Sequence, residues 1–118
     1  MAEHLDQGRA AEEQALAFLR RAGLRLLARN YRARSGEIDL VMQQDETLVF
    51  VEVRYRRSQR FGSAVESVTA GKQRKLLNTA GRFLQERKLD VPCRFDVVGI
   101  CGSQGSKIEW IKDAFQIN

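Results

Sequence analysis

The sequence has few of the features that mark secreted, membrane-spanning or zinc-binding proteins. It contains two cysteines and one histidine, and the cysteines do not form a CxxC pair, so there is no zinc site to propose. No apolar run approaches the roughly 18 residues of a membrane span, and no secretory signal pattern opens the chain. We therefore expect a cytoplasmic protein that does not associate with membranes.

The two cysteines cannot form a disulfide with each other in the fold that we expect. Cys93 and Cys101 stand at opposite ends of one expected strand, and eight steps of about 3.3 Å place them far beyond disulfide reach. We interpret both as small core residues. Repeats and low-complexity segments are also absent from the sequence.

What the sequence does have is a globular composition with an excess of basic residues. Hydrophobic residues make up 43% and charged residues 30%, so disorder is not the default. A length of 118 residues suits one core, and we expect residues 1–118 to form one domain with residues 1–5 frayed. The net charge of +5 and the pI of about 9.7 are typical of proteins that bind nucleic acids.

The segment Gly36–Arg57, GEIDLVMQQDETLVFVEVRYRR, contains the densest group of candidate functional side chains. Two apolar runs, Ile38–Met42 and Leu48–Val53, flank the polar segment Gln43–Glu46. Short apolar runs on either side of a polar turn predict an antiparallel hairpin.

The register of this hairpin decides which side chains share a face of the sheet. If the loop holds two or four residues, Met42 faces Thr47 and Glu37 faces Glu52 across the two strands. Because side chains alternate along a strand, Asp39 and Arg54 then lie on the same face as these glutamates. Three carboxylates would crowd together, where each raises the pKa of the others and burial adds a desolvation cost.

A divalent metal is the simplest compensation for such crowding. Oxygens of Asp39 and Glu52, together with the backbone carbonyl of Val53, are the hard ligands that Mg²⁺ or Mn²⁺ prefers. In an alternative interpretation, Glu37 and Asp39 form ordinary salt bridges near a strand end, since ion-pair networks also perturb carboxylates. The candidate partners for these salt bridges are Arg32, Arg34 and Arg54.

Residues 6–22 are expected to form the first helix, with Asp6 as its N-cap and Gly23 ending it. Its apolar stripe consists of Ala11, Ala15, Phe18, Leu19 and Ala22. Steps of 100° per residue place Glu12 inside this stripe, where a carboxylate requires a partner. In the simpler alternative, Glu12 extends toward solvent or pairs with Arg9.

A first strand over residues 24–34 brings the basic side chain of Arg34 next to the carboxylate face. Tyr55–Gly62, after the hairpin, lacks periodicity and predicts a mobile basic loop. Its arginines suit phosphate oxygens, and its aromatic residues suit stacking on unpaired bases. They are Arg56, Arg57 and Arg60. The alternative is a solvated loop that binds nothing.

A second helix is expected from Thr69 to about Lys88. Its buried side consists of Leu76, Leu77, Ala80, Phe83 and Leu84, and Gln73 extends this stripe toward the N-terminus. Three cations occupy the first turns, where they oppose the helix dipole unless an anion lies nearby. They are Lys72, Arg74 and Lys75, which we therefore assign to nucleic-acid binding.

Two closing strands, Arg94–Cys101 and Lys107–Ile111, complete the expected elements. The predicted fold is an α/β domain of order α-β-β-β-α-β-β, in which a mixed central sheet is flanked by two helices.

Five motifs in this order and spacing carry a family resemblance: GEIDLV, FVEVRYR, FGSAVESV, GKQRKL and RFDVV. From about Gly8 to about Val98, the chain resembles the bacterial YraN family, also called uncharacterised protein family UPF0102. That family is similar in motif layout to the PD-(D/E)xK nuclease superfamily, which includes restriction endonucleases and archaeal Holliday junction resolvases. The resemblance therefore implies a restriction endonuclease-like fold.

The resemblance also implies a magnesium-dependent endonuclease that acts on DNA, including branched or otherwise structured DNA. Asp39 and Glu52 would be metal ligands, Glu12 an outer or second-metal ligand, and Gln73 a residue presented to the active centre. These four residues and Arg54 are the candidate catalytic residues. Because related resolvases act as dimers, a homodimer is expected.

One position departs from the superfamily pattern, which ends in lysine where this chain has Arg54. Arginine stays protonated at neutral pH, so it cannot act as the base that activates water. Lys72 is the nearest replacement. The departure favours a second hypothesis, a nucleic-acid-binding module that keeps the fold without turnover. A protein-interaction scaffold is a third, supported only by the unassigned basic surface.

Overall fold

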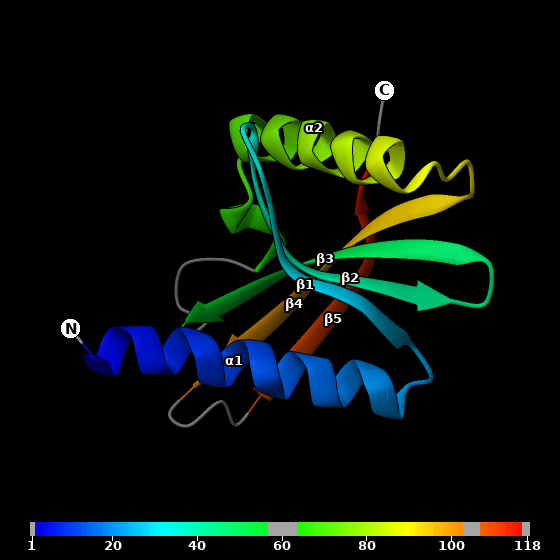
Figure 1. Ribbon diagram of the computed structural model, residues 1–118. Helices are drawn as coiled ribbons and strands as arrows, with labels where there is room; N and C mark the ends of the chain where they lie inside the picture. The colour runs from blue at the N-terminus through cyan, green and yellow to red at the C-terminus, as the bar shows by residue number, and fades with distance from the viewer. Residues whose placement is uncertain (1, 57–63, 103–106, 117–118) are drawn as a thin grey trace.

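The computed structural model describes residues 2–56, 64–102 and 107–116 and shows one five-stranded sheet between two helices (Figure 1). The helices are α1 (Ala2–Arg21) and α2 (Ala70–Arg87), and a short 3₁₀ helix, η1 (Val65–Ser67), precedes α2. The strands are β1 (Arg25–Ala33), β2 (Gly36–Gln44), β3 (Thr47–Arg56), β4 (Cys93–Cys101) and β5 (Lys107–Phe115). The predicted element order and the mixed sheet with two flanking helices are confirmed.

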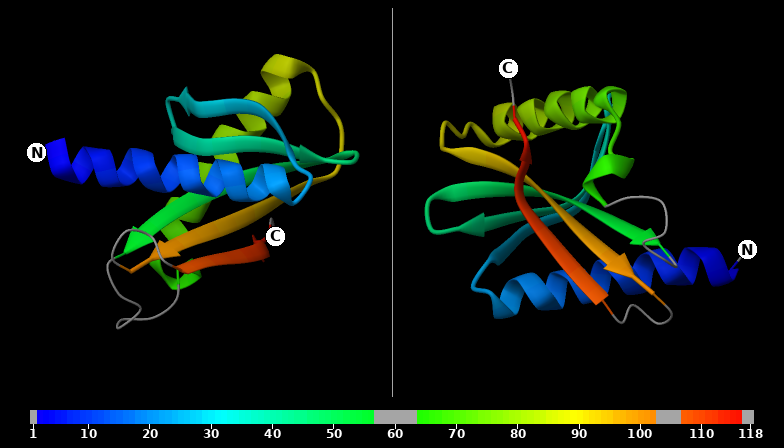
Figure 2. Two further views of the ribbon diagram at one scale, coloured as in Figure 1. Left: turned by 90° about the horizontal axis from the view of Figure 1, so that it is seen from below. Right: turned by 180° about the vertical axis from the view of Figure 1, so that it is seen from behind.

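The strands lie in sequence order across the sheet, β1-β2-β3-β4-β5. All neighbours are antiparallel except β3 and β4, which run parallel. A parallel pair needs a long crossover connection, and α2 supplies it. The two helices cover opposite faces of the sheet (Figure 2), so β3 and β4 are enclosed on both sides.

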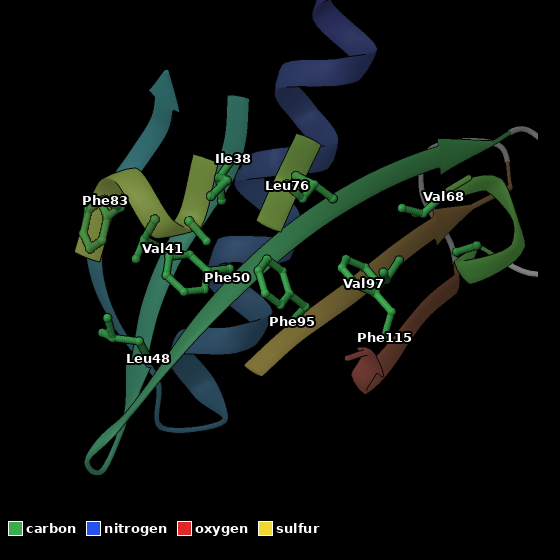
Figure 3. Close-up of a cluster of buried hydrophobic side chains, with 12 residues drawn as sticks. Ile38, Val41, Leu48, Phe50, Val68, Leu76, Phe83, Phe95, Val97 and Phe115 are labelled. Carbon is green, nitrogen blue, oxygen red and sulfur yellow. The ribbon is translucent and has the colours of Figure 1, made fainter. Parts of the chain in front are cut away.

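The core has one layer under each helix. Phe50, Phe83 and Phe95 lie in the layer between α2 and the sheet (Figure 3). The ring of Phe83 is fully buried and makes an edge-to-face contact with Phe50 at 6.0 Å between ring centres. Leu19 of α1 and Val51 of β3 belong to the second layer. The buried aliphatic faces predicted for both helices therefore meet the two faces of one sheet.

The first helix differs from its predicted bounds. It begins at Ala2, so residues 2–5 have helical backbone and Asp6 lies inside the helix instead of capping it. It ends at Arg21, and Ala22, expected in the apolar stripe, is exposed, while Leu16 is buried. The predicted stop at Gly23 is correct, because this residue has φ of 100°, which favours glycine.

The second helix matches its predicted bounds closely. Thr69 is the N-cap, and its hydroxyl accepts a hydrogen bond from the Lys72 backbone N–H at 3.2 Å. Lys88 is the C-cap, with left-handed backbone at φ of 55°. Thr79, not predicted to be buried, is fully buried, and its hydroxyl donates to the Lys75 carbonyl at 2.8 Å.

The hairpin of β2 and β3 has a different register from the one predicted. Gln44 pairs with Thr47, so the loop contains only Asp45 and Glu46, and Asp45 has φ of 53°. The predicted register is wrong by two residues. Because the shift is even, every side chain keeps its predicted face. Continued past the last recorded pair, the true register brings Asp39, and not Glu37, opposite Glu52.

The C-terminal half of the sheet contains a buried carboxylate that sequence analysis did not single out. Asp96 of β4 is 1% exposed and accepts hydrogen bonds from Trp110 Nε1 and the Asp113 N–H, each at 2.9 Å. Arg94 Nε lies 3.0 Å from the same carboxylate. These bonds attach β5 to β4, so we assign Asp96 a structural role.

The two cysteines lie in the strand where they were expected, but only Cys101 is a core residue. Cys93 and Cys101 lie at the two ends of β4, and both are free thiols. Cys101 is buried and Cys93 is half-buried. Within the described residues, neither helix has an apolar stretch long enough to cross a membrane.

Candidate active site

The candidate site lies where β2 and β3 separate. Recorded pairing of these strands stops at Leu40 and Val51, and beyond it the Asp39 carboxylate accepts a hydrogen bond from the Val53 N–H at 2.8 Å. In a strand, the N–H and the carbonyl of one residue point toward the same neighbour. The Val53 carbonyl therefore faces the Asp39 side of β3, as expected for a metal ligand.

The second carboxylate of the site is almost completely buried. Glu52 is 5% exposed, and its Oε2 lies 3.1 Å from Lys72 Nζ and 3.2 Å from Arg54 Nη1. A buried charge is stable only when it is paired and hydrogen-bonded. The cations on α2 and β3 meet this requirement, and they come from the two elements that border the carboxylate.

Glu52 is close enough to Asp39 to perturb the pKa of Asp39. Burial raises the pKa of Asp39 most, and the charge of Glu52 adds to the rise, so that this pKa reaches about 8. The Val53 N–H opposes the shift, whereas the charge of Glu12 and a hydrogen bond to Glu52 increase it. Without a cation, Asp39 therefore holds a proton at neutral pH. A bound cation would favour its ionised form.

In the metal-free protein, we expect Asp39 to lower stability as pH rises from 3.8, its ordinary pKa, to about 8. In this range the folded state keeps a proton that the unfolded chain releases, so the free energy of unfolding falls with rising pH. Below 3.8 both states are protonated and the contribution is fully present. Urea unfolding in EDTA should show wild type losing stability relative to Asp39→Asn across this range. A pH-independent difference between the two proteins would contradict the assignment.

The two carboxylates open into a cleft of about 410 Å³ between the β1–β2 turn and the start of α2. Its charged lining residues are Arg34, Glu37, Asp39, Glu52, Lys72 and Lys75. The three cations form a basic rim around the carboxylates. A phosphate at the cleft would therefore lie near three cations that can offset the charge of the carboxylates.

Glu12 does not join these two carboxylates at the cleft. The Asn30 side-chain amide donates to its two oxygens at 3.2 and 3.3 Å, and Arg29 Nη2 lies 3.9 Å away. Among the described residues, no group of three or more His, Cys, Asp or Glu side chains could hold a metal ion. Glu12 therefore pairs with residues of β1 and not with the suggested partner Arg9, while its charge still adds to the raised pKa of Asp39.

Glu37 follows the ion-pair alternative. Its carboxylate lies 3.3 Å from Arg32 Nε, and its side chain is 35% exposed. Asp39 has no arginine partner among the described residues, so Asp39 does not form the salt bridge of the alternative interpretation. The cleft therefore contains one ordinary salt-bridged carboxylate and one adjacent carboxylate pair.

Arg54 is held in place by the segment before α2. Its Nε donates to Ser67 Oγ at 2.9 Å, its Nη2 to the Ser67 carbonyl at 3.3 Å, and its Nη1 to Glu52. The guanidinium therefore connects β3 to η1. Gln73 donates from Nε2 to the Val68 carbonyl at 3.1 Å and is not among the residues that line the cleft. The structure does not bring Gln73 into the site.

The predicted nucleic-acid contacts fall into four groups. Arg34, Lys72 and Lys75 line the cleft, and Arg74 is exposed one turn into α2. Arg56 is half-buried at the end of β3, which continues past Tyr55, where the loop was expected to begin. Arg57 and Arg60 lie outside the described residues.

Comparison with known proteins decides the family. Residues 11–100 match the model of uncharacterised protein family UPF0102. The chain belongs to the UPF0102 family. A UPF0102 protein of Nitrosomonas europaea is 53% identical over 110 residues, which cover 93% of each chain. Another, from Nitrosococcus oceani, is 50% identical over 119 residues, covering 98% of this chain and 96% of the relative. The family inferred from the five motifs is confirmed.

In this UPF0102 chain, sequence reasoning missed a contact of Ser35, which lines the cleft. Ser35 Oγ and Thr79 Oγ1 are 2.7 Å apart, which attaches the β1–β2 turn to α2. Because the Thr79 hydroxyl donates to Lys75, Ser35 donates to Thr79. The available signal was the position of Thr79 next to Ala80, which belongs to the predicted buried stripe. A buried hydroxyl requires a hydrogen-bond partner, so a contact of Thr79 with another element could have been expected.

The residues of this UPF0102 site fit a hard divalent cation. Mg²⁺ is typically bound by one or two carboxylates, and it keeps several waters and takes phosphate oxygens as further ligands. Asp39, Glu52 and the Val53 carbonyl supply such a donor set. A cage of three carboxylates is therefore not required.

Proposed function

We propose that this protein is a metal-dependent nuclease that hydrolyses phosphodiester bonds in DNA. The adjacent pair of Asp39 and Glu52 at the base of a basic-rimmed cleft carries the proposal. Such a pair is costly for stability, because each charge disfavours the other and both lose hydration. Strongly perturbed carboxylates in a cleft are characteristic of functional sites.

Asp39, Glu52 and the Val53 carbonyl would hold Mg²⁺ or Mn²⁺. When bound, the metal would polarise the scissile phosphate and make a bound water more acidic. The protein orients the ligands, since the Val53 N–H fixes Asp39 and two cations fix Glu52. Arg34 and Lys75 would hold the phosphates that flank the scissile bond.

Lys72 takes the role that the PD-(D/E)xK pattern gives to its lysine. Arg54 is engaged by Ser67 and Glu52, so we regard it as a positioning residue. The Lys72 amine lies next to Glu52 on the cleft wall, and its side chain is 43% exposed. It can therefore contact a substrate phosphate or the attacking water while remaining beside the carboxylate pair.

Lys72→Gln should reduce cleavage about 10²-fold or more, the usual size of a positioned proton-transfer or charge-stabilising group. Arg74→Gln, which removes a neighbouring exposed cation, is the matched control and should lower DNA affinity only slightly. Rates are compared at saturating DNA with Mg²⁺ and with Mn²⁺, after both variants are shown to unfold like wild type. A Lys72→Gln enzyme as fast as wild type would rule out this role.

The charge of the cleft supports a proposal for the substrate class. We propose that the substrate is branched or structured DNA, because the basic rim suits closely spaced phosphates. We also propose that the enzyme acts in the cytoplasm. The described residues contain one such carboxylate cleft. Cutting two strands would therefore require two copies, which favours a homodimer.

A nucleic-acid-binding module without turnover is the second candidate, and Arg54 favours it. Such a module would bind DNA with a steep salt dependence, close to a slope of 0.9 per phosphate contact, and would not cut it with either metal. Cleavage with Mg²⁺ or Mn²⁺ separates the two cases. A nuclease that uses Lys72 should cut DNA as wild type, whereas a binding module should stay inactive both as wild type and as Arg54→Lys, which restores the lysine of the pattern.

A further inference from the structure

A second concavity, of about 990 Å³, lies beside the carboxylate cleft. It runs between the β1–β2 turn and the C-terminal half of α2. We call it the α2 groove. Arg34 and Ser35 line both the α2 groove and the cleft, so the two are continuous around the turn. None of the α2 groove residues beyond this turn has a role in the proposed reaction.

The charges that line the α2 groove favour the binding of a polyanion. Its lining includes four basic residues, Arg32, Arg34, Arg82 and Lys88, and two acidic residues, Glu86 and Asp90. Glu86 is paired, because Arg82 Nε lies 3.2 Å from it and the Tyr31 hydroxyl donates to it. Lys88, by contrast, forms no salt bridge with a described residue. Cations thus lie at both ends of the α2 groove, Arg34 at the cleft and Lys88 at the far end.

The side chains that line the α2 groove suit the unpaired bases of a single strand. Half-buried Leu84 and Leu89 offer apolar surface to base faces. Asn78 and Gln85 offer side-chain amides, which can pair with base edges.

We infer that the α2 groove takes a single nucleic-acid strand that continues from the cleft, an inference that rests on the proposed function. From Lys75 to Lys88 the helix rises about 20 Å, which corresponds to about six nucleotides at 3.4 Å each. The hydrogen bond between Ser35 and Thr79 holds the turn that separates the two concavities. A strand would therefore pass Arg34 as it leaves the cleft and reach Lys88 about six nucleotides later.

The test compares two DNA probes in EDTA by fluorescence anisotropy over a salt series. One probe is a blunt duplex, and the other is the same duplex with a single-stranded extension of about six nucleotides, the reach of the α2 groove, tested with each polarity. Wild type should bind one of the extended duplexes more tightly than the blunt one. Lys88→Gln should remove this gain and reduce the salt slope for the extended duplex by about 0.7, the value for one single-strand contact.

Two further variants complete the design. Gln85→Glu adds a negative charge to the α2 groove and should also remove the gain, without relying on Lys88. Arg21→Gln removes an exposed cation from α1, on the opposite face of the sheet, and should leave the gain unchanged. Both positions are exposed, so neither change should affect folding.

The outcomes for the α2 groove and for the nuclease are separable. The inference is overturned if wild type binds the extended duplexes no more tightly than the blunt one, even if the protein cuts DNA. It is also overturned if the tighter binding survives both Lys88→Gln and Gln85→Glu. Conversely, a gain that depends on Lys88 in a protein that never cuts DNA with Mg²⁺ or Mn²⁺ overturns the nuclease proposal and keeps the groove.

Discussion

Asp39→Asn is expected to abolish metal-dependent DNA cleavage while DNA binding in EDTA is preserved. Asparagine has nearly the same shape and can still accept the Val53 hydrogen bond, but it removes a charge that a cation requires. If the metal supplies several kcal/mol of transition-state stabilisation, the rate should fall by about 10³-fold or more. Glu52→Gln should have a similar effect. Cleavage is measured on linear, flapped and four-way DNA with Mg²⁺ and with Mn²⁺.

The matched control for this prediction is Glu37→Gln. Glu37 lines the same cleft, but it is already paired with Arg32 and is far more exposed than Glu52. Its removal should therefore change the rate by only a small factor. Equal losses in all three variants would show that cleavage depends on the total negative charge of the cleft and not on the Asp39–Glu52 pair.

The two carboxylate variants should also separate catalysis from stability. Without metal, Asp39→Asn should be as stable as wild type or more stable above pH 3.8, because burial and the charge of Glu52 make folded wild type keep a proton on Asp39 that the unfolded chain releases. Loss of cleavage together with loss of folding would leave the catalytic assignment without support. Urea unfolding of each variant in EDTA is therefore measured alongside the rates.

Phe83→Ala is expected to lower the free energy of unfolding by about 3–5 kcal/mol, a large effect for one substitution. The ring of Phe83 is fully buried between α2 and the sheet, and it contacts Tyr31 and Phe50 edge-to-face at 5.1 and 6.0 Å. Truncation leaves a cavity that these rings cannot fill without moving α2. Since α2 carries Lys72, DNA cleavage should also fall near the shifted melting temperature.

Val91→Ala is the control for the Phe83 prediction. Val91 is 37% exposed and lies after α2, so its truncation should change the free energy of unfolding by no more than about 0.5 kcal/mol. Both variants are compared by urea denaturation. One common slope of the free energy of unfolding against urea concentration is used for all curves. A cost below about 1 kcal/mol for Phe83→Ala would mean that this core position is not packed as the structure has it.

The elements of the fold could be predicted because their signals are local. Thr69 has the side chain of an N-cap, and the apolar residues after it recur with the period of a helix. The loop of the hairpin was misplaced because Gln43 and Gln44 are polar. Their pairing with Leu48 and Thr47 keeps them in the strands, and composition does not reveal this.

The candidate site was predictable only in part, for a related reason. Asp39 and Glu52 come together because their faces depend on the period of a strand, which a two-residue error in register does not alter. The partners of Glu12 and Gln73, Asn30 and the Val68 carbonyl, could not be predicted because they depend on how helices meet the sheet and its connections. The bond between Ser35 and Thr79 spans 44 residues, so no local pattern reveals it.

The central claim is that Asp39 and Glu52 form a metal site, and a crystal structure of the protein in Mn²⁺ tests it most directly. We expect an anomalous peak within ligand distance, about 2.1 Å for a site of the Mg²⁺ type, of one oxygen of each carboxylate and of the Val53 carbonyl. The contradicting result is a Mn²⁺-soaked crystal without a peak there, in which Glu52 remains paired with Lys72 and Arg54 and Asp39 remains bonded to the Val53 N–H.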